Sequence, residues 1–461
     1  MKTTSFNYRF LIGISIVTAM GGLLFGYDWV VIGGAKPFYE QYFNIVDSPS
    51  LQGWAMSCAL IGCLFGAFFS GMLSEKYGRK KLLILAAFLF IISAYGSGAA
   101  QHFTPFIVYR IIGGVGIGLA SNLSPMYISE ISPSNIRGKL VSLNQLTIVI
   151  GILAAQIINW QIAEPVSKMA TNSEILNSWN GQTGWRIMFW MELIPAGLFF
   201  LLMFFVPESP RWLAQNYPEK SERILAKIGG ESYAKNELET INASIQNSVE
   251  TNTKTLLNPK LKKILIIGIV IAAFQQWCGI NVIFNYADEV FTAAGYGVSD
   301  MLFNIVITGS INLIFTLIAM ATIDRWGRRA LMLFGSASLA AIYALMGAAY
   351  FFNVEGLPLL ILVVTAIACY AMSLAPVTWV VLSEIFPNKI RGLAMSVATI
   401  ALWLASFTLT YSFPLLNSFF GASGTFWLYG IISLGGLIFI YKKLPETKGK
   451  SLETIENELT K

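Results

Sequence analysis

The stretch "SEISPSNIRG" at residues 129–138 returns as "SEIFPNKIRG" at residues 383–392. Two further motif pairs repeat in the same order at a similar separation: "EKYGRK" at 75–80 with "DRWGRR" at 324–329, and "PESPRW" at 207–212 with "PETKGK" at 445–450. Motifs that recur in order, roughly 250 residues apart, are typical of a chain built from two similar halves. We therefore predict two structurally related halves in parallel orientation.

The composition places both halves in a membrane. Of the 461 residues, 55% are hydrophobic and only 12% are charged, whereas soluble domains have about 25% charged residues. Apolar stretches of about 20 residues, long enough to cross a bilayer, recur at 9–32, 51–74, 82–101, 105–129, 140–163, 186–206, 264–287, 301–323, 330–353, 357–383, 392–415 and 424–441. The prediction is an all-α membrane protein with twelve transmembrane helices, six in each half.

The positions of the basic residues predict the orientation. Most of the 31 Lys and Arg fall in the N-terminus, the even-to-odd loops and the C-terminus, while Lys36 and Lys168 fall in the opposite loops. Cytoplasmic loops carry the excess of positive charge, so both termini are predicted to be cytoplasmic, and the pI near 9.0 does not indicate nucleic-acid binding. The predicted units are 1–206, a six-helix bundle; 207–263, a cytoplasmic linker with short helices; 264–443, a second six-helix bundle; and 444–461, a cytoplasmic tail.

The reactive side chains argue against an enzyme. His102 is the single histidine, and the four cysteines lie inside apolar stretches without metal-ligand spacing. No nucleophile, base and orienting group come together in the sequence. We expect no catalytic residues, no metal and no cofactor.

Three ionisable residues lie well inside the predicted helices: Asp28, Arg110 and Glu192. The helix directions place all three in the extracellular half of the first bundle. A charge at the bilayer centre costs about 2.5 to 3.5 kcal/mol on insertion scales, so Asp28 needs a partner or a function. One interpretation is a structural ion pair with Arg110. The other is a proton site, in which separating the pair lets Asp28 bind or release a proton, with Glu192 as a second relay member or a residue facing a wet cavity.

The repeated cytoplasmic motifs combine basic residues with acids. We predict latch contacts between helix ends, with Glu75, Arg79 and Arg137 around Glu130 in the first half, and Asp324, Arg328 and Arg391 around Glu384 in the second. Positive-inside anchoring alone would explain the basic residues but not the paired acids. We expect the latches to break when the extracellular side closes.

The seventh predicted helix carries amides and no charge. Its "AFQQWCGINVIFNY" holds Gln275, Gln276, Asn281 and Asn285 among aromatic residues. Amides donate and accept hydrogen bonds at once, which suits a neutral ligand with many hydroxyls, whereas an anion would need Lys or Arg. Gln145, Asn312, Trp379 and Trp403 could complete such a site, with an indole against a sugar ring. Each amide taken alone also fits helix-packing contacts.

Taken together, these motifs resemble the sugar porter family of the major facilitator superfamily. The matching elements are "GGLLFGYD", "YGRKK", "RIIGGVGIGLASNLSPMYISEISPSNIRGKLVSLNQ", "PESPRWL", "QQWCGIN", "DRWGRR", "LSEIFPNKIRG" and "PETKGKSLE", which span about residues 21–453. Within the family, the sequence is most similar to bacterial xylose–proton symporters. The resemblance implies a major facilitator fold with a central site that opens alternately to each side.

The resemblance also implies roles for individual residues. Asp28 matches the proton-coupling aspartate, Arg110 its partner, and Glu192 an acid linked to proton use. Animal facilitative glucose transporters have Asn at the first position and lack the helix 6 acid, so both residues favour symport. The implied sugar contacts are Gln145, Gln275, Gln276, Asn281, Asn312, Trp379 and Trp403.

Three departures from the xylose symporters are visible. Leu402 replaces a Gln, "LAPVTW" at Leu374–Trp379 replaces "WGPVCW", and Glu75 replaces the usual Asp. The first two changes remove an amide and an indole near the implied site, so they bear on xylose more than on monosaccharides in general.

The sequence as a whole predicts a proton-coupled importer of a neutral monosaccharide, xylose or another pentose or hexose, in the inner membrane of a bacterium. Its expected partners are the sugar, the proton and the lipid bilayer, with no nucleic acid, and it is expected to function as a monomer. A proton-independent facilitator with the same sugar site is the first alternative. A transporter-like sugar sensor would usually add a long signalling tail, whereas this chain ends at Lys461, shortly after "PETKGKSLE".

Overall fold

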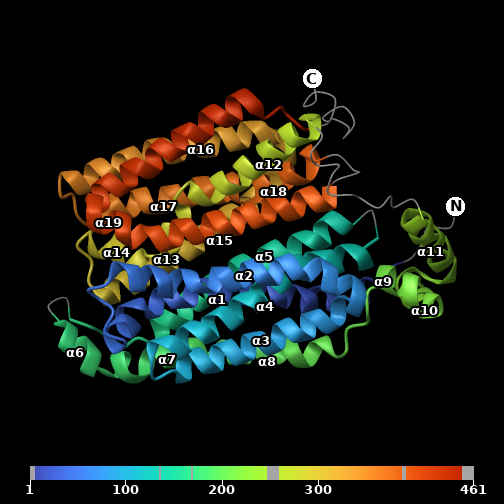
Figure 1. The fold of residues 1–461 in the computed structure, drawn as a ribbon, viewed down its shortest axis with the longest axis horizontal. Coiled ribbons are helices and arrows are strands. Elements are labelled where there is room, and N and C mark those ends of the chain that lie inside the picture. The colour runs from blue at the N-terminus through green and yellow to red at the C-terminus, as the bar shows by residue number, and fades with distance from the viewer. Residues whose placement is uncertain (1–5, 134–135, 168–169, 247–258, 387–390, 449–461) are drawn as a thin grey trace.

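The structure, a computed structural model, describes residues 6–133, 136–167, 170–246, 259–386 and 391–448. Every regular element in these ranges is helical. Figure 1 shows the helices in two bundles that pack along their lengths, one made by α1 to α8 and the other by α12 to α19. We call them the first and the second bundle.

The first bundle is built from long helices and a broken sixth span. Its elements are α1 (Tyr8–Tyr42), α2 (Pro49–Tyr77), α3 (Arg79–Ala99), α4 (Phe103–Ile131), α5 (Arg137–Ile162), the short α6 (Asn172–Asn177), a π-helical turn (Asn180–Gly184), α7 (Trp185–Trp190) and α8 (Leu193–Met203). The π-helical turn, α7 and α8 form one apolar span, Asn180–Met203.

The second bundle contains more interruptions. Its elements are α12 (Pro259–Trp277), α13 (Ile280–Asn285), α14 (Ala287–Thr292), α15 (Val298–Trp326), α16 (Arg328–Phe351), α17 (Leu357–Met372), α18 (Leu374–Ile385) and α19 (Arg391–Lys443). The helical path breaks at Gly279 after α12 and at Ser373 between α17 and α18. Such breaks in membrane helices occur where backbone lines a cavity or is covered by neighbouring helices.

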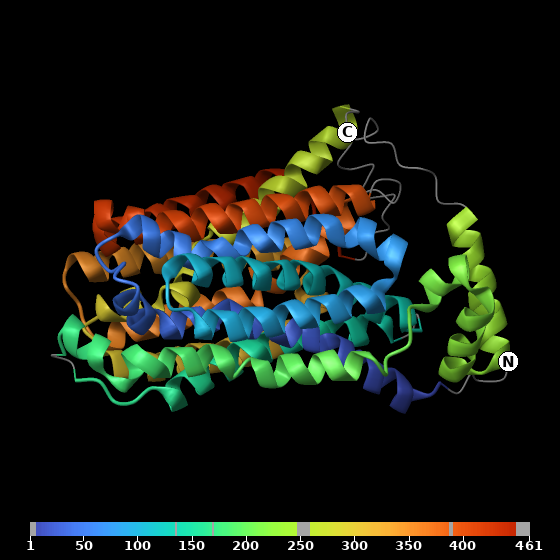
Figure 2. The ribbon, with the colours of Figure 1, turned by 60° about the horizontal axis from the view of Figure 1, so that its bottom comes forward.

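Three short helices join the bundles: α9 (Pro210–Asn216), α10 (Pro218–Gly229) and α11 (Glu231–Gln246). Figure 2 shows them together at one end of the molecule, beside the start of α1. The Asn7 N–H donates to the carbonyl of Ile228 at 2.8 Å, and the ring of Phe6 packs edge-on against Tyr233 at 5.3 Å. The start of the chain is therefore fixed to the segment between the bundles.

The described residues contain 11 helices that are long and apolar enough to cross a membrane. The eleventh, α19, is 53 residues long and includes the stretches predicted as two separate helices. It changes direction at Gly421, where φ is 68° and the backbone is not helical. The predicted eleventh and twelfth helices are thus both present as helix, joined across a bend.

The two ends of the bundles carry different contacts. The motif end, as we call it, holds the turns at Gly78 and Gly327, and the far end holds the loop between α1 and α2. At the far end, Ser50 Oγ lies 3.1 Å from the Tyr411 hydroxyl, and the Val166 N–H donates to Ser299 Oγ at 2.9 Å. Both contacts join the first bundle to the second. The far end of this structure is closed.

Glycines allow α2 and α4 to pack backbone to backbone. Gly62 and Gly66 of α2 face Gly114 and Gly118 of α4, which is the small-xxx-small spacing of close membrane helices. A Cβ at Gly114 would lie 1.9 Å from the carbonyl oxygen of Ala59, and one at Gly62 would lie 2.1 Å from that of Ile111. The helix that carries Arg110 is held in place by this contact.

We expect Gly114→Ala to destabilise the protein. The added methyl meets main-chain atoms that cannot rotate away, and overpacking of this kind costs about 1–3 kcal/mol. Thermal unfolding in detergent, followed by loss of monodisperse protein, measures the effect. Gly71→Ala, at an exposed position of α2, is the matched control, since nothing lies within 4 Å of its Cβ position. Equal melting temperatures for the two variants would contradict the prediction.

Candidate functional site

The structure brings Asp28 and Arg110 together inside the first bundle. Asp28 of α1 is fully buried, and Arg110 of α4 is 2% exposed. Arg110 Nη1 donates to Asp28 Oδ1, and Nη2 lies 3.3 Å from the backbone oxygen of Asp28. The guanidinium also lies over the ring of Phe189, 5.6 Å from its centroid. The buried Arg110 guanidinium is therefore stabilised by hydrogen bonds to Asp28 and by the aromatic face of Phe189.

Glu192 joins this pair at the break between α7 and α8. It is fully buried, and the charged groups that act on it electrostatically are Asp28 and Arg110. The cluster thus holds two carboxyl groups and one guanidinium. Two ionised carboxylates against one cation would leave an uncompensated buried charge. The arrangement is electrically neutral when the two acids share one proton.

The amides of the seventh span form a chain of hydrogen bonds. Gln275 Nε2 donates to the Tyr370 hydroxyl at 2.7 Å, Gln276 Nε2 donates to Gln275 Oε1 at 2.7 Å, and Asn281 Nδ2 donates to Gln276 Oε1. All three amides are buried. The chain crosses the break at Gly279, so an irregular backbone and a polar row occupy the same place in the second bundle. Tyr370 of α17 was not predicted from the sequence.

The other predicted sugar contacts lie on different helices. Asn312 of α15 is buried, Gln145 of α5 is half-buried, and Trp403 of α19 is 5% exposed. Trp379 of α18 is 37% exposed and lies outside the aromatic cluster that the described residues form around Trp403. The structure therefore places Trp403 in the interior between the bundles.

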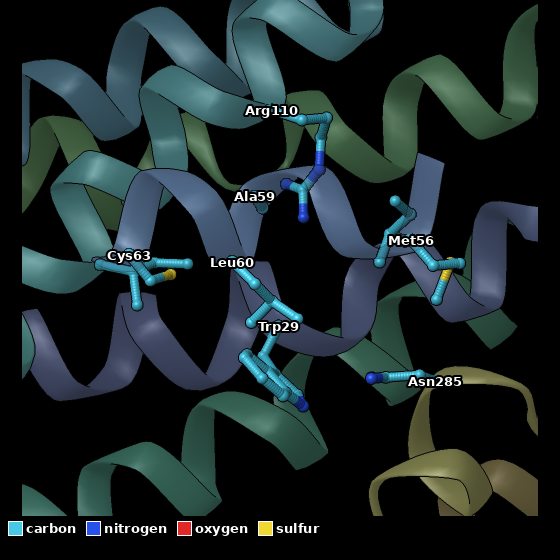
Figure 3. A pocket seen from close by; sticks show the side chains of 9 residues that line it. Trp29, Met56, Ala59, Leu60, Cys63, Arg110 and Asn285 are labelled. Atoms are coloured by element: carbon cyan, nitrogen blue, oxygen red, sulfur yellow. The ribbon is translucent and has the colours of Figure 1, made fainter. Parts of the chain in front are cut away.

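A small cavity lies between the ion pair and the seventh span. It has a volume of about 10 Å³, room for at most one water molecule. Figure 3 shows Arg110 on one side of it and Trp29 and Asn285 on the other, with Met56 and Leu60 between them. The Asn285 side-chain oxygen and the Trp403 indole nitrogen are buried and have no protein hydrogen-bond partner in the described part of the chain. Polar atoms left in this way are the groups that a hydroxylated ligand or water would satisfy.

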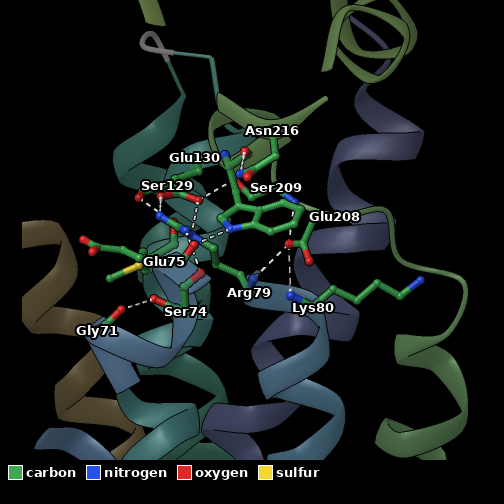
Figure 4. Close-up of polar contacts among 12 residues, drawn as sticks. Gly71, Ser74, Glu75, Arg79, Lys80, Ser129, Glu130, Glu208, Ser209 and Asn216 are labelled. Carbon is green, nitrogen blue, oxygen red and sulfur yellow. Dashed lines mark hydrogen bonds and ion pairs between the residues drawn. The ribbon is translucent and has the colours of Figure 1, made fainter. Parts of the chain in front are cut away.

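The first latch forms within the first bundle at the motif end (Figure 4). Arg79 binds both carboxylate oxygens of Glu130, at 2.9 and 3.0 Å. Glu208, the second residue of "PESPRW", accepts the N–H groups of Arg79 at 2.9 Å and Lys80 at 3.1 Å. Ser209 donates its hydroxyl to Glu130. This contact therefore unites all three repeated motifs.

The second bundle repeats this arrangement residue by residue. Arg328 Nη2 lies 3.1 Å from Glu384 Oε1, Thr447 donates its hydroxyl to Glu384 at 2.6 Å, and Glu446 accepts the N–H groups of Arg328 and Arg329 at 3.0 and 3.1 Å. Partial burial alone would raise the pKa of Glu446, but its four backbone N–H donors outweigh burial and hold the pKa below its usual range.

The remaining predicted latch residues differ from expectation or lie outside the description. Arg137 Nε donates to the Ser132 carbonyl at 3.3 Å, and Glu75 contributes its backbone oxygen to the Trp212 indole at 2.8 Å. Among the described contacts, Arg137 forms no ion pair with Glu130, and Glu75 forms none with Arg79 or Arg137. The side chains of Asp324 and Arg391 lie outside the described residues. Glu208 and Glu446 were missed, although the third repeated motif pair was a signal for them.

The structure bears on the prediction that the latches break when the extracellular side closes, because it shows two of the latch ion pairs. Arg79–Glu130 and Arg328–Glu384 are intact while the far end is closed. Both members of each pair come from the same bundle, so a relative movement of the bundles does not pull them apart. The latches stiffen each bundle rather than connect the two.

A second charged cluster was also missed. The sequence placed Lys36 in a loop, but α1 continues through Pro37 to Tyr42, and Lys36 is 1% exposed. Its ammonium lies 3.3 Å from Glu40 of α1, 2.8 Å from Asp288 and 2.9 Å from Glu289 of α14. Asn417 of α19 also binds Glu289, at 3.2 Å. This far-end cluster, defined as Lys36, Glu40, Asp288 and Glu289, joins the two bundles by charge.

Comparison with known proteins agrees with this architecture. The profile of the family described as "Sugar (and other) transporter" matches residues 14–459. The D-xylose-proton symporter of Escherichia coli K12 is 38% identical, covering 98% of this chain and 96% of its own, and the arabinose-proton symporter of Bacillus subtilis 168 is 40% identical over the same shares.

Solved structures give the same result. The inward-open form of the xylose transporter XylE from Escherichia coli has a TM-score of 0.85 and 37% identity, covering 97% of this chain and 99% of that one. The complex of XylE with 6-bromo-6-deoxy-D-glucose has a TM-score of 0.81 and 38% identity, covering 98% and 100%. The matches to the family profile, to the relatives and to the solved structures each cover nearly the whole chain, so the protein belongs to the sugar transporter family.

Proposed function

We propose that the protein is a proton-coupled symporter that imports a neutral monosaccharide, a pentose or hexose, by alternating access. The relatives named for proton-linked xylose and arabinose transport support the sugar and the proton. The observation that carries the proposal is the buried cluster of two acids and one guanidinium, Asp28, Glu192 and Arg110. Buried acids inside membrane helices mark proton pathways, and Asp28 can bind a proton when its pairing with Arg110 is released. The protein is a transporter and not an enzyme.

The proposal assigns twelve membrane crossings, with α19 counted as two about its bend at Gly421. The motif end, with both termini, faces the cytoplasm, because basic residues are retained on that side. The units are residues 1–206 and 264–443 as bundles, 207–263 as the cytoplasmic linker and 444–461 as the tail. The protein works as a monomer in the inner membrane of a bacterium and binds no nucleic acid.

In the proposed cycle, Glu192 keeps one proton while Asp28 binds and releases a second one. With the far end closed, Asp28 is paired with Arg110, so the neutralising proton is on Glu192. With the far end open to the outside, a second proton reaches Asp28 and releases Arg110. Freed from Asp28, α4 can shift against α1, and the sugar site closes to the outside. Release of the proton towards the cytoplasm restores the pair.

The proposed sugar site lies between the bundles, with the amide chain Gln275–Gln276–Asn281 supplying most of its hydrogen bonds. Gln145, Asn312 and Trp403 contribute from three further helices. Trp379 belongs to the proposal through the family resemblance. Charged side chains are not needed in such a site, since the ligand is neutral.

External pH measures the coupling directly. In a lightly buffered, de-energised suspension of cells that express the protein, we expect alkalinisation when the transported sugar is added, because each sugar carries protons inward. The substrate is found by adding D-xylose, L-arabinose and D-glucose in turn. Sugar equilibration without any pH change would contradict symport and favour the facilitator, in which Asp28–Arg110 is a structural pair.

A further inference from the structure

Trp29 holds a position between the proton site and the sugar site. It follows Asp28 directly, and successive helical residues point about 100° apart. Asp28 therefore faces Arg110 of α4, while Trp29 faces the second bundle. Its ring centroid lies 6.2 Å from that of Trp403 in α19 and 5.9 Å from that of Phe25, one turn earlier. Phe25 is also 6.0 Å from Trp403, so three rings from both bundles form one cluster.

The side of the cavity next to Trp29 is almost entirely apolar. Besides the indole it is lined by Ile32, Met56, Ala59, Leu60, Cys63 and Ile117, and its polar members are Asn285 and Arg110. Figure 3 shows the indole filling the space below Leu60, beside Asn285. Arg110 is engaged with Asp28. A hydroxyl group brought against this side of the cavity would therefore find few hydrogen-bond partners.

The opposite side of the sugar site is polar. The amide chain of Gln275, Gln276 and Asn281 lies on the seventh span, so the edge of a pyranose ring that carries adjacent hydroxyls is best satisfied there. A ring held in this way would direct its C5 edge away from the amides, towards Trp29. In a pentopyranose that edge is a bare CH₂, while a hexopyranose carries a hydroxymethyl group.

We propose that Trp29 is a specificity-determining residue that selects pentoses over hexoses by occupying the space that a C5 hydroxymethyl group would need. This inference rests on the proposed function, because it concerns the same sugar site. A hydroxymethyl group directed at Trp29 must displace the indole and lose the hydrogen bonds of its own hydroxyl. Discrimination by such added groups reaches about 10- to 200-fold.

The test is counterflow exchange of radiolabelled D-xylose and D-glucose in proteoliposomes without a proton gradient, which separates specificity from coupling. For the wild type we expect faster xylose than glucose exchange. In Trp29→Ala we expect the ratio of glucose to xylose exchange to rise at least about 10-fold, and in Trp29→Phe, which keeps a smaller ring, a smaller rise. Trp427→Ala is the matched control, since this half-exposed indole packs against Phe351 within the second bundle.

The outcomes test the role of Trp29 and the proposed transport function separately. A ratio in both Trp29 variants within two-fold of the wild type, or a wild type that prefers glucose, overturns the role of Trp29 while the transport function stands. A wild type that exchanges neither of these sugars nor L-arabinose overturns the proposed function itself. If Trp29→Ala gives no folded protein, the ratio in Trp29→Phe decides.

Discussion

Asp28→Asn is expected to abolish sugar accumulation while leaving sugar exchange largely intact. The wild type can use about 2.3 kcal/mol for each charge that crosses 100 mV, which supports roughly 50-fold accumulation at 1.4 kcal/mol per decade. Asn keeps an oxygen that accepts from Arg110, so the packing of α1 and α4 is retained. It has no titratable proton, so sugar movement is no longer tied to the proton gradient and the accumulation ratio falls to about one.

Two assays on the same proteoliposomes measure this separation. Uptake against a sugar gradient with an imposed proton gradient reports coupling, and counterflow without a gradient reports sugar binding and bundle movement. Asp47→Asn is the matched control, because Asp47 is exposed at the far end. Active accumulation that survives Asp28→Asn would exclude Asp28 as the coupling site. Loss of both activities would indicate a structural role for the pair.

Lys36→Met is expected to open the far end and slow transport by more than about 100-fold. The buried ammonium is shared by Glu40, Asp288 and Glu289. Without it, carboxylates of the first and second bundles face each other across the closed far end with no cation between them. Removing one member of a buried ion pair costs about 3–5 kcal/mol. Here the bundles can separate, so that water reaches the unpaired carboxylates and reduces this cost.

Distances between spin labels at the far end test this expectation. Labels at positions 47 and 418, one on each bundle, should move apart in Lys36→Met and stay close in Lys36→Arg, which keeps the charge. Lys76→Met near the end of α2 is the control for loss of an exposed lysine. Unchanged distances and transport in Lys36→Met would show that the far-end cluster does not hold the closed state.

Much of the architecture follows from the sequence. The repeated motifs indicate two halves, the apolar stretches coincide with the helices, and the equal depth of Asp28 and Arg110 suggests the pair that α1 and α4 form. Such features depend on local sequence and on helix direction, which fix depth in a membrane before any packing is known. The clustering of the amides in the seventh span is likewise visible in the local sequence.

The far-end cluster was beyond this reasoning. The first apolar stretch ends at residue 32, which put Lys36 in a loop, yet α1 continues through Pro37 to Tyr42. Lys36 is buried only because α14, about 250 residues later in the chain, supplies its partners. Glu208 was missed for a related reason: it acts on backbone N–H groups, which a search for opposite charges does not consider. The exposure of Trp379 depends on the packing of α18, which the sequence does not specify.

The motif-end latches have a mechanical consequence. Since each latch fixes helix ends within its own bundle, each bundle behaves as a stiff lever. α2, with 29 residues, is about 44 Å long at 1.5 Å per residue. If it pivots near its middle, a tilt of about 15°, as in known domain rotations, displaces either end by roughly 6 Å. Charge neutralisation at the far end is thereby converted into an opening at the opposite end, and no chain of altered contacts along the helices is required to transmit it.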